Sequence, residues 1–343
     1  MRKGKDISAD ATPCARVVAI PLPVFGIEEV RFFTAFPAVL SYLLYAFVLY
    51  VKIRRWKTSI QLVHSHHIFP QGLFGLMLAR MLNVPLIVTA TGGDVNITMT
   101  QRRALRAACL FVLKRAWAVI AVSKPLQNAL RDFGISNTVY IPNSVDQRSV
   151  QAVEQSAKGD SILYVGSITQ RKRPLVLLQA FDSVTKVFPT ATLVMVGQGP
   201  QMETLTREIA ARGLAEQVTC LPKVNGQTLN RIRANTQLFV LPSASEGLSL
   251  ALLEAMAAGQ VVIASRNESH EAVLKNGENA LLFATDDSEE LARQIMLTIS
   301  DRALRCRISR SAKILLEKEF SNTVVAGRLE DLYLKALELR YTH

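Results

Sequence analysis

Two glutamates eight positions apart, Glu246 and Glu254, are the residues whose type and spacing most strongly indicate chemistry in this sequence. They lie in the segment SASEGLSLALLEAMAAGQVVIAS, whose pattern predicts a strand at Leu238–Leu241, a loop of small residues and then a helix. Ser249 is the expected N-cap of that helix and Gly259 its expected end. Free backbone N–H groups in the first helical turn favour a phosphate, and carboxylates beside it would accept hydrogen bonds from sugar hydroxyls. The alternative is two solvated glutamates that flank a helix start.

A second group of residues indicates a phosphate site. Gly166 follows a predicted strand, and the basic run Arg171-Lys172-Arg173 lies further along the same strand-to-helix turn. Lysine as a compact ammonium and arginine as a planar fork can both hold a diphosphate. Three basic residues in a row could equally be a solvated surface run. With Gly166 before them and Glu246 further along, we expect them to bind phosphate.

Taken in order, these motifs resemble the donor site of the family 4 (group 1) retaining glycosyltransferases. That resemblance implies an α/β protein of the GT-B architecture, in which two Rossmann-like domains with parallel sheets face each other across a cleft. It covers roughly residues 15 to 285 and is best in the second half. The other matching segments are Ile141–Asp146, Tyr164–Ile168 and Val194–Pro200. The turn in the last of these lacks the third glycine and the acidic residue of a dinucleotide fingerprint, so a nicotinamide enzyme is disfavoured.

The resemblance also implies roles for particular residues. Lys172, Glu246 and Asp94 are implied as catalytic, with Glu246 on the donor sugar hydroxyls and Glu254 on the ribose. The residues implied in donor binding are Gly166, Ser167, Arg171, Gly197, Lys223, Val224, Gly247, Leu248, Ser249 and Glu254. Ser167 stands where the family commonly has an arginine, so Arg171 or Arg173 is expected to supply that charge. No Asp-x-Asp metal motif occurs, and we expect neither a metal nor a cofactor; the nucleotide-sugar is a substrate.

On the acceptor side the resemblance implies His66, His67, Thr91 and Gly92. The family usually has a histidine before this glycine, and Thr91 takes its place. His64 and His66 would point the same way on a strand, but no carboxylate or cysteine lies nearby in sequence, so a metal site is not expected. Histidines with a purely structural role are the alternative.

The alternation of strand and helix patterns predicts the domain organisation. Residues 1–148 are expected to form the acceptor-side domain, with a C-terminal helix, 320–343, that packs back on it, and 149–319 the donor domain. Strands are predicted at 15–20, 62–64, 86–90, 119–122, 139–141, 161–165, 192–196, 217–220, 238–241, 261–264 and 281–283. Helices are predicted at 38–55, 72–82, 99–115, 124–133, 174–187, 201–212, 227–234, 249–258 and 288–300. The family's usual first strand and glycine-rich loop are not found, which leaves a truncated start, a replaced loop or impaired activity as alternatives.

Composition and charge indicate where the protein works. The four scattered cysteines and the lack of an apolar signal core at the start favour a reducing, cytoplasmic compartment. Almost all of the net charge of +12 comes from residues 1–148. Its basic clusters are Lys52, Arg54, Arg55 and Lys57, and Arg102, Arg103, Arg106, Lys114 and Arg115. No nucleic-acid motif accompanies them, so we expect an anionic membrane surface or a lipid-linked phosphate acceptor as partner; solvated helix faces are the alternative.

The uncharged stretch 32–51 has the length of a membrane span, but Pro37 interrupts it and it occupies a crossover-helix position. A buried crossover helix, an in-plane membrane contact and a true span remain open, and peripheral association is the working expectation. The expected activity is transfer of a sugar from a nucleotide-sugar to a saccharide or lipid-linked acceptor, with retention, in cell-surface polysaccharide or glycolipid biosynthesis. A GT-B sugar-nucleotide epimerase and a non-catalytic nucleotide-sugar-binding or membrane scaffold protein are the alternatives.

Overall fold

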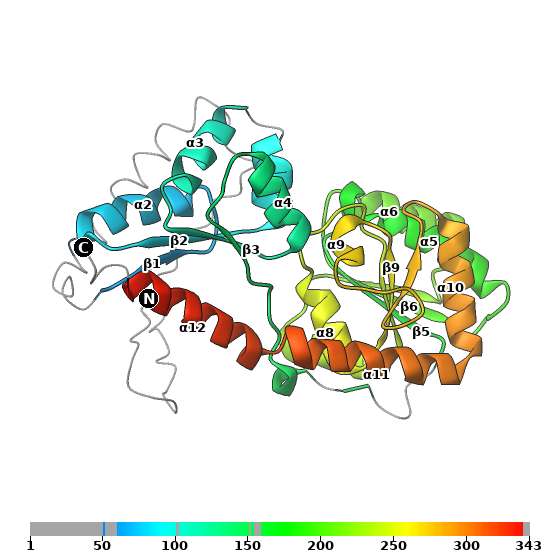
Figure 1. The fold of residues 1–343 in the computed structure, drawn as a ribbon. Helices are drawn as coiled ribbons and strands as arrows, with labels where there is room; N and C mark the ends of the chain where they lie inside the picture. Colours follow the sequence, from blue (N-terminus) through cyan, green and yellow to red (C-terminus); the bar gives the residue numbers. More distant parts are fainter. Residues whose placement is uncertain (1–50, 52–59, 101–102, 151, 154–158, 339–343) are drawn as a thin grey trace. The chain divides into compact units, whose positions relative to one another are not determined.

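The computed structural model of the protein describes Val51 and residues 60–100, 103–150, 152–153 and 159–338 (Figure 1). The described residues from 60 onward belong to one compact unit, Ile53–His343. The predicted strand at 15–20, the predicted helix at 38–55 and the basic cluster at 52–57 lie outside the described residues, as does the apolar stretch 32–51 apart from Val51. In the part that is described, no helix combines the length and the apolar character needed to cross a membrane.

The first sheet has parallel strands in the order β1-β2-β3-β4. These strands are β1 (Val63–Ser65), β2 (Leu86–Ala90), β3 (Ala118–Ala121) and β4 (Thr138–Tyr140). The apolar runs LIVTA and AVIA in β2 and β3 are almost wholly buried, as expected for central parallel strands covered on both faces. The helices whose apolar side chains join the cluster on one face are α2 (Gln71–Leu82), α3 (Arg103–Leu113) and α4 (Lys124–Asp132).

The opposite face of this sheet is covered by the C-terminal helix α12 (Asn322–Glu338). Its residues Val325, Leu332 and Ala336 pack against Ile87 and Ile120 of the two central strands. The helix therefore joins the sheet formed by the first half of the chain, although it lies at the far end of the sequence. The boundaries of the two domains stay a prediction.

The second sheet is also parallel, in the order β10-β9-β8-β5-β6-β7. Its strands are β5 (Ser161–Val165), β6 (Thr192–Val196), β7 (Val218–Leu221), β8 (Leu238–Leu241), β9 (Val261–Ser265) and β10 (Leu281–Phe283). The helices on one face are α5 (Pro174–Thr185), α6 (Met202–Ala211) and α10 (Ser288–Ser300), and those on the other are α7 (Gly226–Ala234) and α8 (Leu250–Ala258). Helix α11 (Arg302–Glu319) contributes to both apolar clusters.

The order of the second sheet determines where a ligand would bind. From β5 the chain moves outward through β6 to β7, and it then returns to place β8 on the other side of β5. The loops that follow β5 and β8 consequently diverge at the carboxyl edge of the sheet. In parallel α/β sheets, ligands bind in the crevice at such a switch point.

Most predicted elements agree with the structure to within two residues. In the segment predicted as a helix at 99–115, a π-helix, η3 (Asp94–Met99), comes directly before the helical residue Thr100, and α3 covers Arg103–Leu113. Three short helices were not predicted: η4 (Gln147–Ser149), η5 (Gln170–Lys172) and α9 (Glu268–Glu271). Two of them, η5 and α9, support the candidate site.

Candidate active site

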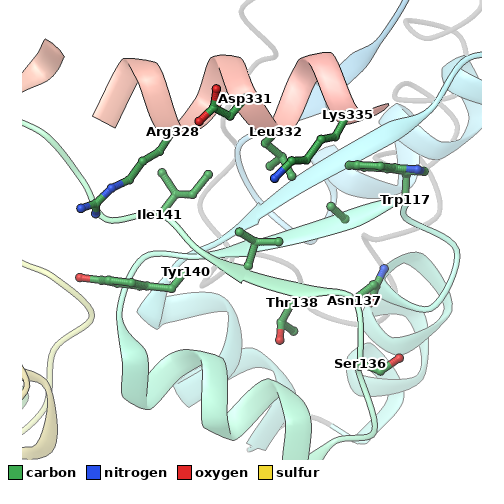
Figure 2. A pocket seen from close by; sticks show the side chains of 12 residues that line it. Trp117, Ser136, Asn137, Thr138, Tyr140, Ile141, Arg328, Asp331, Leu332 and Lys335 are labelled. Atoms are coloured by element: carbon green, nitrogen blue, oxygen red, sulfur yellow. The ribbon is translucent and has the colours of Figure 1, made fainter. Parts of the chain in front are cut away.

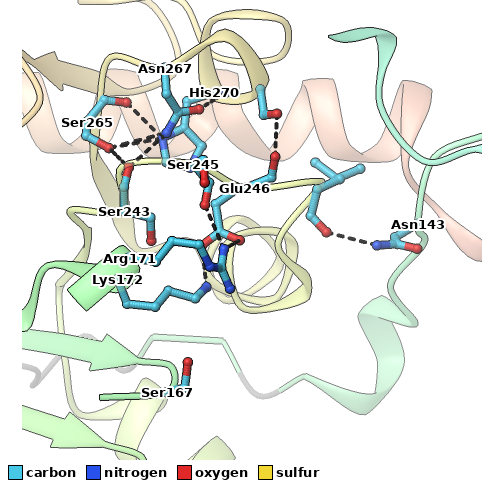
Figure 3. Close-up of polar contacts among 12 residues, drawn as sticks. Asn143, Ser167, Arg171, Lys172, Ser243, Ser245, Glu246, Ser265, Asn267 and His270 are labelled. Atoms are coloured by element: carbon cyan, nitrogen blue, oxygen red, sulfur yellow. Dashed lines mark hydrogen bonds and ion pairs between the residues drawn. The ribbon is translucent and has the colours of Figure 1, made fainter. Parts of the chain in front are cut away.

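The loops after β5 and β8 meet through Lys172 and Glu246 (Figure 3). The Lys172 ammonium donates to Oε1 of Glu246, whose side chain is 8% exposed. Arg171 lies beside this pair, with Nη1 3.6 Å from Oε2 of Glu246. A backbone hydrogen bond also joins these two loops: the Ala244 N–H donates to the Arg171 carbonyl at 2.9 Å. Arg171 and Lys172 of the predicted basic run therefore form one cluster with Glu246, the first glutamate of the pattern.

The charges of this cluster do not cancel. Burial by itself would raise the pKa of the Glu246 carboxyl, but the Lys172 charge and hydrogen bond, with Arg171, lower that pKa below its ordinary value. Glu246 is therefore ionised at neutral pH. Two cations face one carboxylate, which leaves a net positive charge at the switch point. An anionic group such as a diphosphate would be attracted there.

A polar network behind Glu246 holds its loop in place (Figure 3). The side chains of Ser265 and Asn267 both donate to the Ser243 carbonyl, at 2.5 and 2.9 Å, and Ser269 donates to the Glu246 carbonyl at 2.7 Å. His270, which is 2% exposed, has Nδ1 2.8 Å from the Ser265 carbonyl and 3.0 Å from Nδ2 of Asn267. The sequence analysis missed this network, because nothing local in sequence marks these polar residues as buried.

Helix α8 begins as predicted. Ser249 occupies the N-cap position without a side-chain cap hydrogen bond, and Gly259 ends the helix with φ at 81°. The backbone N–H groups of the first turn therefore do not donate to the Ser249 hydroxyl and can donate to an anion instead. Asn143 comes from the chain after the first sheet and donates from Nδ2 to the Leu248 carbonyl at 2.8 Å, a contact that the sequence analysis also missed.

A pocket of about 260 Å³ lies beside these groups. Its lining residues are Thr91, Gly92, Gly93, Val122, Asn143, Arg171, Ser245, Glu246, Gly247 and Leu248. Gly92 and Gly247 meet across it so closely that a Cβ on Gly92 would lie 2.9 Å from the Gly247 nitrogen. Glycine is needed at this contact because two backbones approach each other there. The pocket joins part of the predicted donor site to Thr91 and Gly92 of the predicted acceptor side.

Asp94 is buried and does not line this pocket. Its Oδ2 accepts from the Thr91 N–H at 3.2 Å, from the Thr91 hydroxyl at 3.0 Å and from the Ile68 N–H at 3.4 Å. His67 lies on the other side, with Nδ1 3.4 Å from the same oxygen. Hydrogen bonding to Asp94 raises the pKa of His67 despite partial burial. In this geometry Asp94 holds the turn that carries Thr91 and Gly92, and its catalytic role stays a prediction.

The neighbouring His64 contacts α12, and His66 contacts His64. His64 bonds through Nδ1 to the Tyr333 hydroxyl at 2.6 Å and through Nε2 to the Thr89 hydroxyl at 2.8 Å. His66 stacks on His64, with ring centroids 4.4 Å apart. Burial, with the adjacent His66 charge, lowers the pKa of His64 to about 4, so this ring is neutral at neutral pH. His66 and His67 do not line the pocket beside Glu246.

The glycine turns at the ends of β5 and β6 have a packing function. A Cβ on Gly197 would overlap the Gly166 carbonyl oxygen, and one on Gly199 would overlap the Ile168 carbonyl oxygen. The buried Tyr164 hydroxyl donates to the Ser167 carbonyl at 2.9 Å and so supports the first turn. These two glycines allow the turns to pack side by side at the carboxyl edge of the sheet.

The two arginines of the basic run have different partners. Arg173, at φ 54°, pairs with Asp286 after β10, with Nε and Oδ1 2.6 Å apart, whereas Arg171 donates to the Ser245 carbonyl at 2.7 Å. Of the two arginines offered as the missing positive charge, Arg171 therefore lies at the pocket and Arg173 does not.

Of the ten predicted donor residues, Arg171, Gly247 and Leu248 line the pocket beside Glu246. The other seven do not line it, namely Gly166, Ser167, Gly197, Lys223, Val224, Ser249 and Glu254. Lys223 is exposed after β7, and the half-buried Val224 packs on the apolar cluster under α8. Glu254 forms an ion pair with Arg233 of α7, a partner that the sequence analysis did not identify. Within the described ranges, no group of histidine, cysteine and acidic side chains could hold a metal ion.

A second, larger cavity of about 460 Å³ lies between α12 and the strands β3 and β4 (Figure 2). Trp117 and Tyr140 line it together with Arg328 and Lys335 of α12. It contains none of the predicted site residues. The smaller pocket, which contains Glu246 and Arg171, is therefore the candidate active site.

Two parallel Rossmann-like sheets, with a basic cluster and a helix N-terminus at a switch point, define an α/β protein of the GT-B architecture. Solved structures support this fold. That of Anabaena HepE in complex with UDP aligns with a TM-score of 0.74 at 18% identity, over 84% of this chain and 82% of that one. Sucrose-phosphate synthase from Thermosynechococcus elongatus aligns with a TM-score of 0.73 at 22% identity, over 85% and 78%.

Sequence comparison identifies the family. Residues 10–148 match the model described as Glycosyltransferase Family 4, and residues 146–314 match that of Glycosyl transferases group 1. The protein belongs to the family 4 (group 1) glycosyltransferases. Curated relatives include a phosphatidyl-myo-inositol mannosyltransferase of Mycobacterium leprae, 25% identical over 92% of this chain and 81% of the relative. Another is the N-acetyl-alpha-D-glucosaminyl L-malate synthase of Bacillus anthracis, 24% identical over 82% and 76%.

Proposed function

We propose that this glycosyltransferase moves a sugar from a nucleotide-sugar, with a uridine diphosphate sugar as the first donor to test, to a saccharide or lipid-linked acceptor with retention. The observation that carries the proposal is the Lys172–Glu246 pair beside Arg171 at the switch point. The structural neighbour HepE has been solved with UDP and with UDP-glucose, which supports uridine as the base.

The proposed chemistry follows from the charges. When the bond between the anomeric carbon and the β-phosphate oxygen breaks, its electron pair stays on the leaving diphosphate. Lys172, Arg171 and the first-turn amides of α8 would balance that charge without a metal ion. The acceptor oxygen attacks from the face that the diphosphate leaves, and its proton passes to a phosphate oxygen. Glu246, held by Lys172, would accept hydrogen bonds from the donor sugar.

The acceptor is proposed to be lipid-linked and to be glycosylated at the cytoplasmic face of a membrane. The relatives named for phosphatidyl-myo-inositol and for alpha-monoglucosyldiacylglycerol support a lipid acceptor. At the end of α3, Lys114 and Arg115 are exposed, and the Arg115 guanidinium lies 3.9 Å from the centre of the Phe111 ring, which is 42% exposed. An exposed aromatic ring with adjacent cations suits the surface of an anionic bilayer.

The test of catalysis compares the wild-type chain with Glu246→Gln and Lys172→Ala, using UDP-sugars, lipid extract as acceptor and EDTA in a parallel arm. Transfer should fall at least ~10²-fold in each variant, the scale for one lost charge-stabilising group, and EDTA should leave it unchanged. Retention is checked by the anomeric configuration of the product in NMR. Near-normal turnover in either variant contradicts the site assignment.

The test of membrane association is co-sedimentation with phosphatidylglycerol vesicles and with phosphatidylcholine vesicles. We expect binding to the anionic vesicles alone, weakened by salt and by Lys114→Glu with Arg115→Glu. Equal binding to both vesicle types contradicts the membrane part of the proposal and leaves the donor site untouched.

A further inference from the structure

Arg233 is a buried cation with one strong partner. It lies on α7 with a side chain 2% exposed, although arginine is almost never fully buried unless it is paired. Its Nη2 donates to Oε2 of Glu254 on α8, and its Nη1 makes a longer contact of 3.3 Å with Asn230 Oδ1. Nε is buried and has no partner in the described part of the chain. Glu254 therefore supplies most of the compensation for this charge.

Glu254 is arranged differently from its partner. Its side chain is 33% exposed, and Arg233 binds only one of its two carboxylate oxygens. Across the described residues, no donor contacts Oε1. One oxygen is thus fixed from the protein interior while the other is free to accept hydrogen bonds from outside.

Glu254 is the fifth residue of α8, whereas Arg233 is the eighth of the nine residues of α7, so the carboxylate is the member of the pair nearer to the start of its helix. Helix α8 follows directly from the loop that carries Glu246, and α7 begins at Gly226, directly after the loop of Lys223 and Val224. Both helices therefore begin at the carboxyl edge of the second sheet, where the candidate donor site lies.

We infer that Arg233 is a positioning residue that orients the Glu254 carboxylate so that Oε1 accepts hydrogen bonds from the ribose hydroxyls of the donor nucleotide. This inference rests on the proposed function. Its consequence is specific: Arg233, which does not touch the nucleotide, determines how strongly the site prefers a ribonucleotide to its deoxy form.

Two physical effects support this role. A partly exposed glutamate on a helix samples several rotamers, and ordering it on binding costs free energy that a guanidinium already in place removes. The ion pair is also neutral overall, so Glu254 can lie near a diphosphate without adding an unbalanced negative charge to the site. Without Arg233 both advantages are lost, although Glu254 itself remains.

The opposing explanation is that the pair only joins α7 to α8. Such a role would lower stability when Arg233 is replaced, and it could weaken all nucleotides equally. It would not change the ratio of the affinities for a nucleotide with and without its ribose hydroxyls. That ratio is therefore the decisive quantity.

The experiment measures binding by calorimetry on the full chain. UDP, ADP and GDP are compared first, and the tightest is taken forward with its 2′,3′-dideoxy form. The variants are Arg233→Met, Arg233→Lys and the double variant Arg233→Met with Glu254→Gln, which leaves no charge unpaired. Arg212→Met is the control, because it removes an arginine that pairs with Glu208 and Asp182 at the end of α6. Circular dichroism checks the folding of each variant.

The wild-type chain should prefer the ribonucleotide by roughly tenfold or more, the scale of a hydrogen bond to a charged group. In Arg233→Met and in the double variant the preference should fall to within about twofold, with partial recovery in Arg233→Lys and none lost in Arg212→Met. A full preference in Arg233→Met or in the double variant overturns the inference. Tight binding without any preference in the wild-type chain overturns it too and leaves the proposed function standing, whereas no binding of any nucleotide overturns both.

Discussion

Replacing Lys172 with methionine should change both the stability of the protein and its rate of sugar transfer, and a second replacement should show that the two effects have different causes. Lys172 is 12% exposed and Glu246 8% exposed, whereas Arg171 is 42% exposed. Removing one partner of a buried pair leaves the other charge without compensation, which costs about 3–5 kcal/mol. Removing the partly exposed Arg171 leaves Glu246 still paired with Lys172, so that loss should cost only about 0–1 kcal/mol. Lys172→Met should therefore destabilise the protein far more than Arg171→Met.

Both replacements should also lower transfer. Both cations face the place where the diphosphate charge develops, so Lys172→Met should lower the transfer rate ~10²–10³-fold and Arg171→Met at least ~10-fold. In the double variant Lys172→Met with Glu246→Gln, no buried charge is left unpaired. That variant should regain about 2 kcal/mol of stability or more relative to Lys172→Met, while transfer stays at least ~10²-fold low.

Stability is measured by urea unfolding, with the slope compared between variants to check that the same surface is exposed. Transfer is measured as the initial rate of nucleotide release with saturating donor and acceptor. Equal destabilisation by Lys172→Met and Arg171→Met would refute the claim that Lys172 and Glu246 form a buried ion pair. Recovery of transfer together with stability in the double variant would refute the assignment of Lys172 to the leaving group.

Three further outcomes are expected. His64→Gln should remove a pH dependence: the pKa of this ring falls from 6.5 to about 4 on folding, so the unfolded chain binds more protons between those values. Wild-type stability should therefore drop by about 3 kcal/mol as the pH falls through that window, and the variant should show a flatter curve in urea titrations at several pH values. Gly197→Ala should lower the unfolding midpoint strongly, since its methyl group would overlap a backbone oxygen of the neighbouring turn; an unchanged midpoint would show that the turns separate freely. Gly92→Ala should reduce transfer ~10-fold or more, because the new Cβ would meet the Gly247 nitrogen at 2.9 Å, whereas Gly93→Ala, with nothing within 4 Å of its Cβ, should transfer normally.

Much of the fold could be predicted because its signals are local. The strands at 86–90, 161–165 and 192–196 are continuous apolar runs bounded by glycine or polar residues, and their predicted limits match the structure. Gly259 ends α8 in the left-handed conformation that the sequence indicated. The π-helix at Asp94–Met99 was not predicted, because the apolar pattern does not distinguish a π-helical stretch from an α-helix.

The candidate site was predicted in its residue types and missed in its pairings. Glu246 with Lys172 could be expected, since both belong to motifs that border the same switch point. Arg233 could not, because its sequence context is that of an ordinary helix surface and only the packing of α7 on α8 buries it. The same holds for His270, whose burial depends on the loop that carries Glu246. Sequence periodicity reports which face of an element is apolar, but not which polar side chain a distant element covers.

The pairings resolve a difficulty in the original motif. Two glutamates eight residues apart would give a site for a diphosphate an unfavourable pair of negative charges. In the structure each is bound to a cation from another element, Glu246 to Lys172 and Glu254 to Arg233. Arg171 then adds a positive charge on the side of Glu246 alone. The acidic residues can therefore bind hydroxyl groups while the net charge of the site still favours an anion, and that charge is concentrated beside Glu246, where we propose that the leaving group departs.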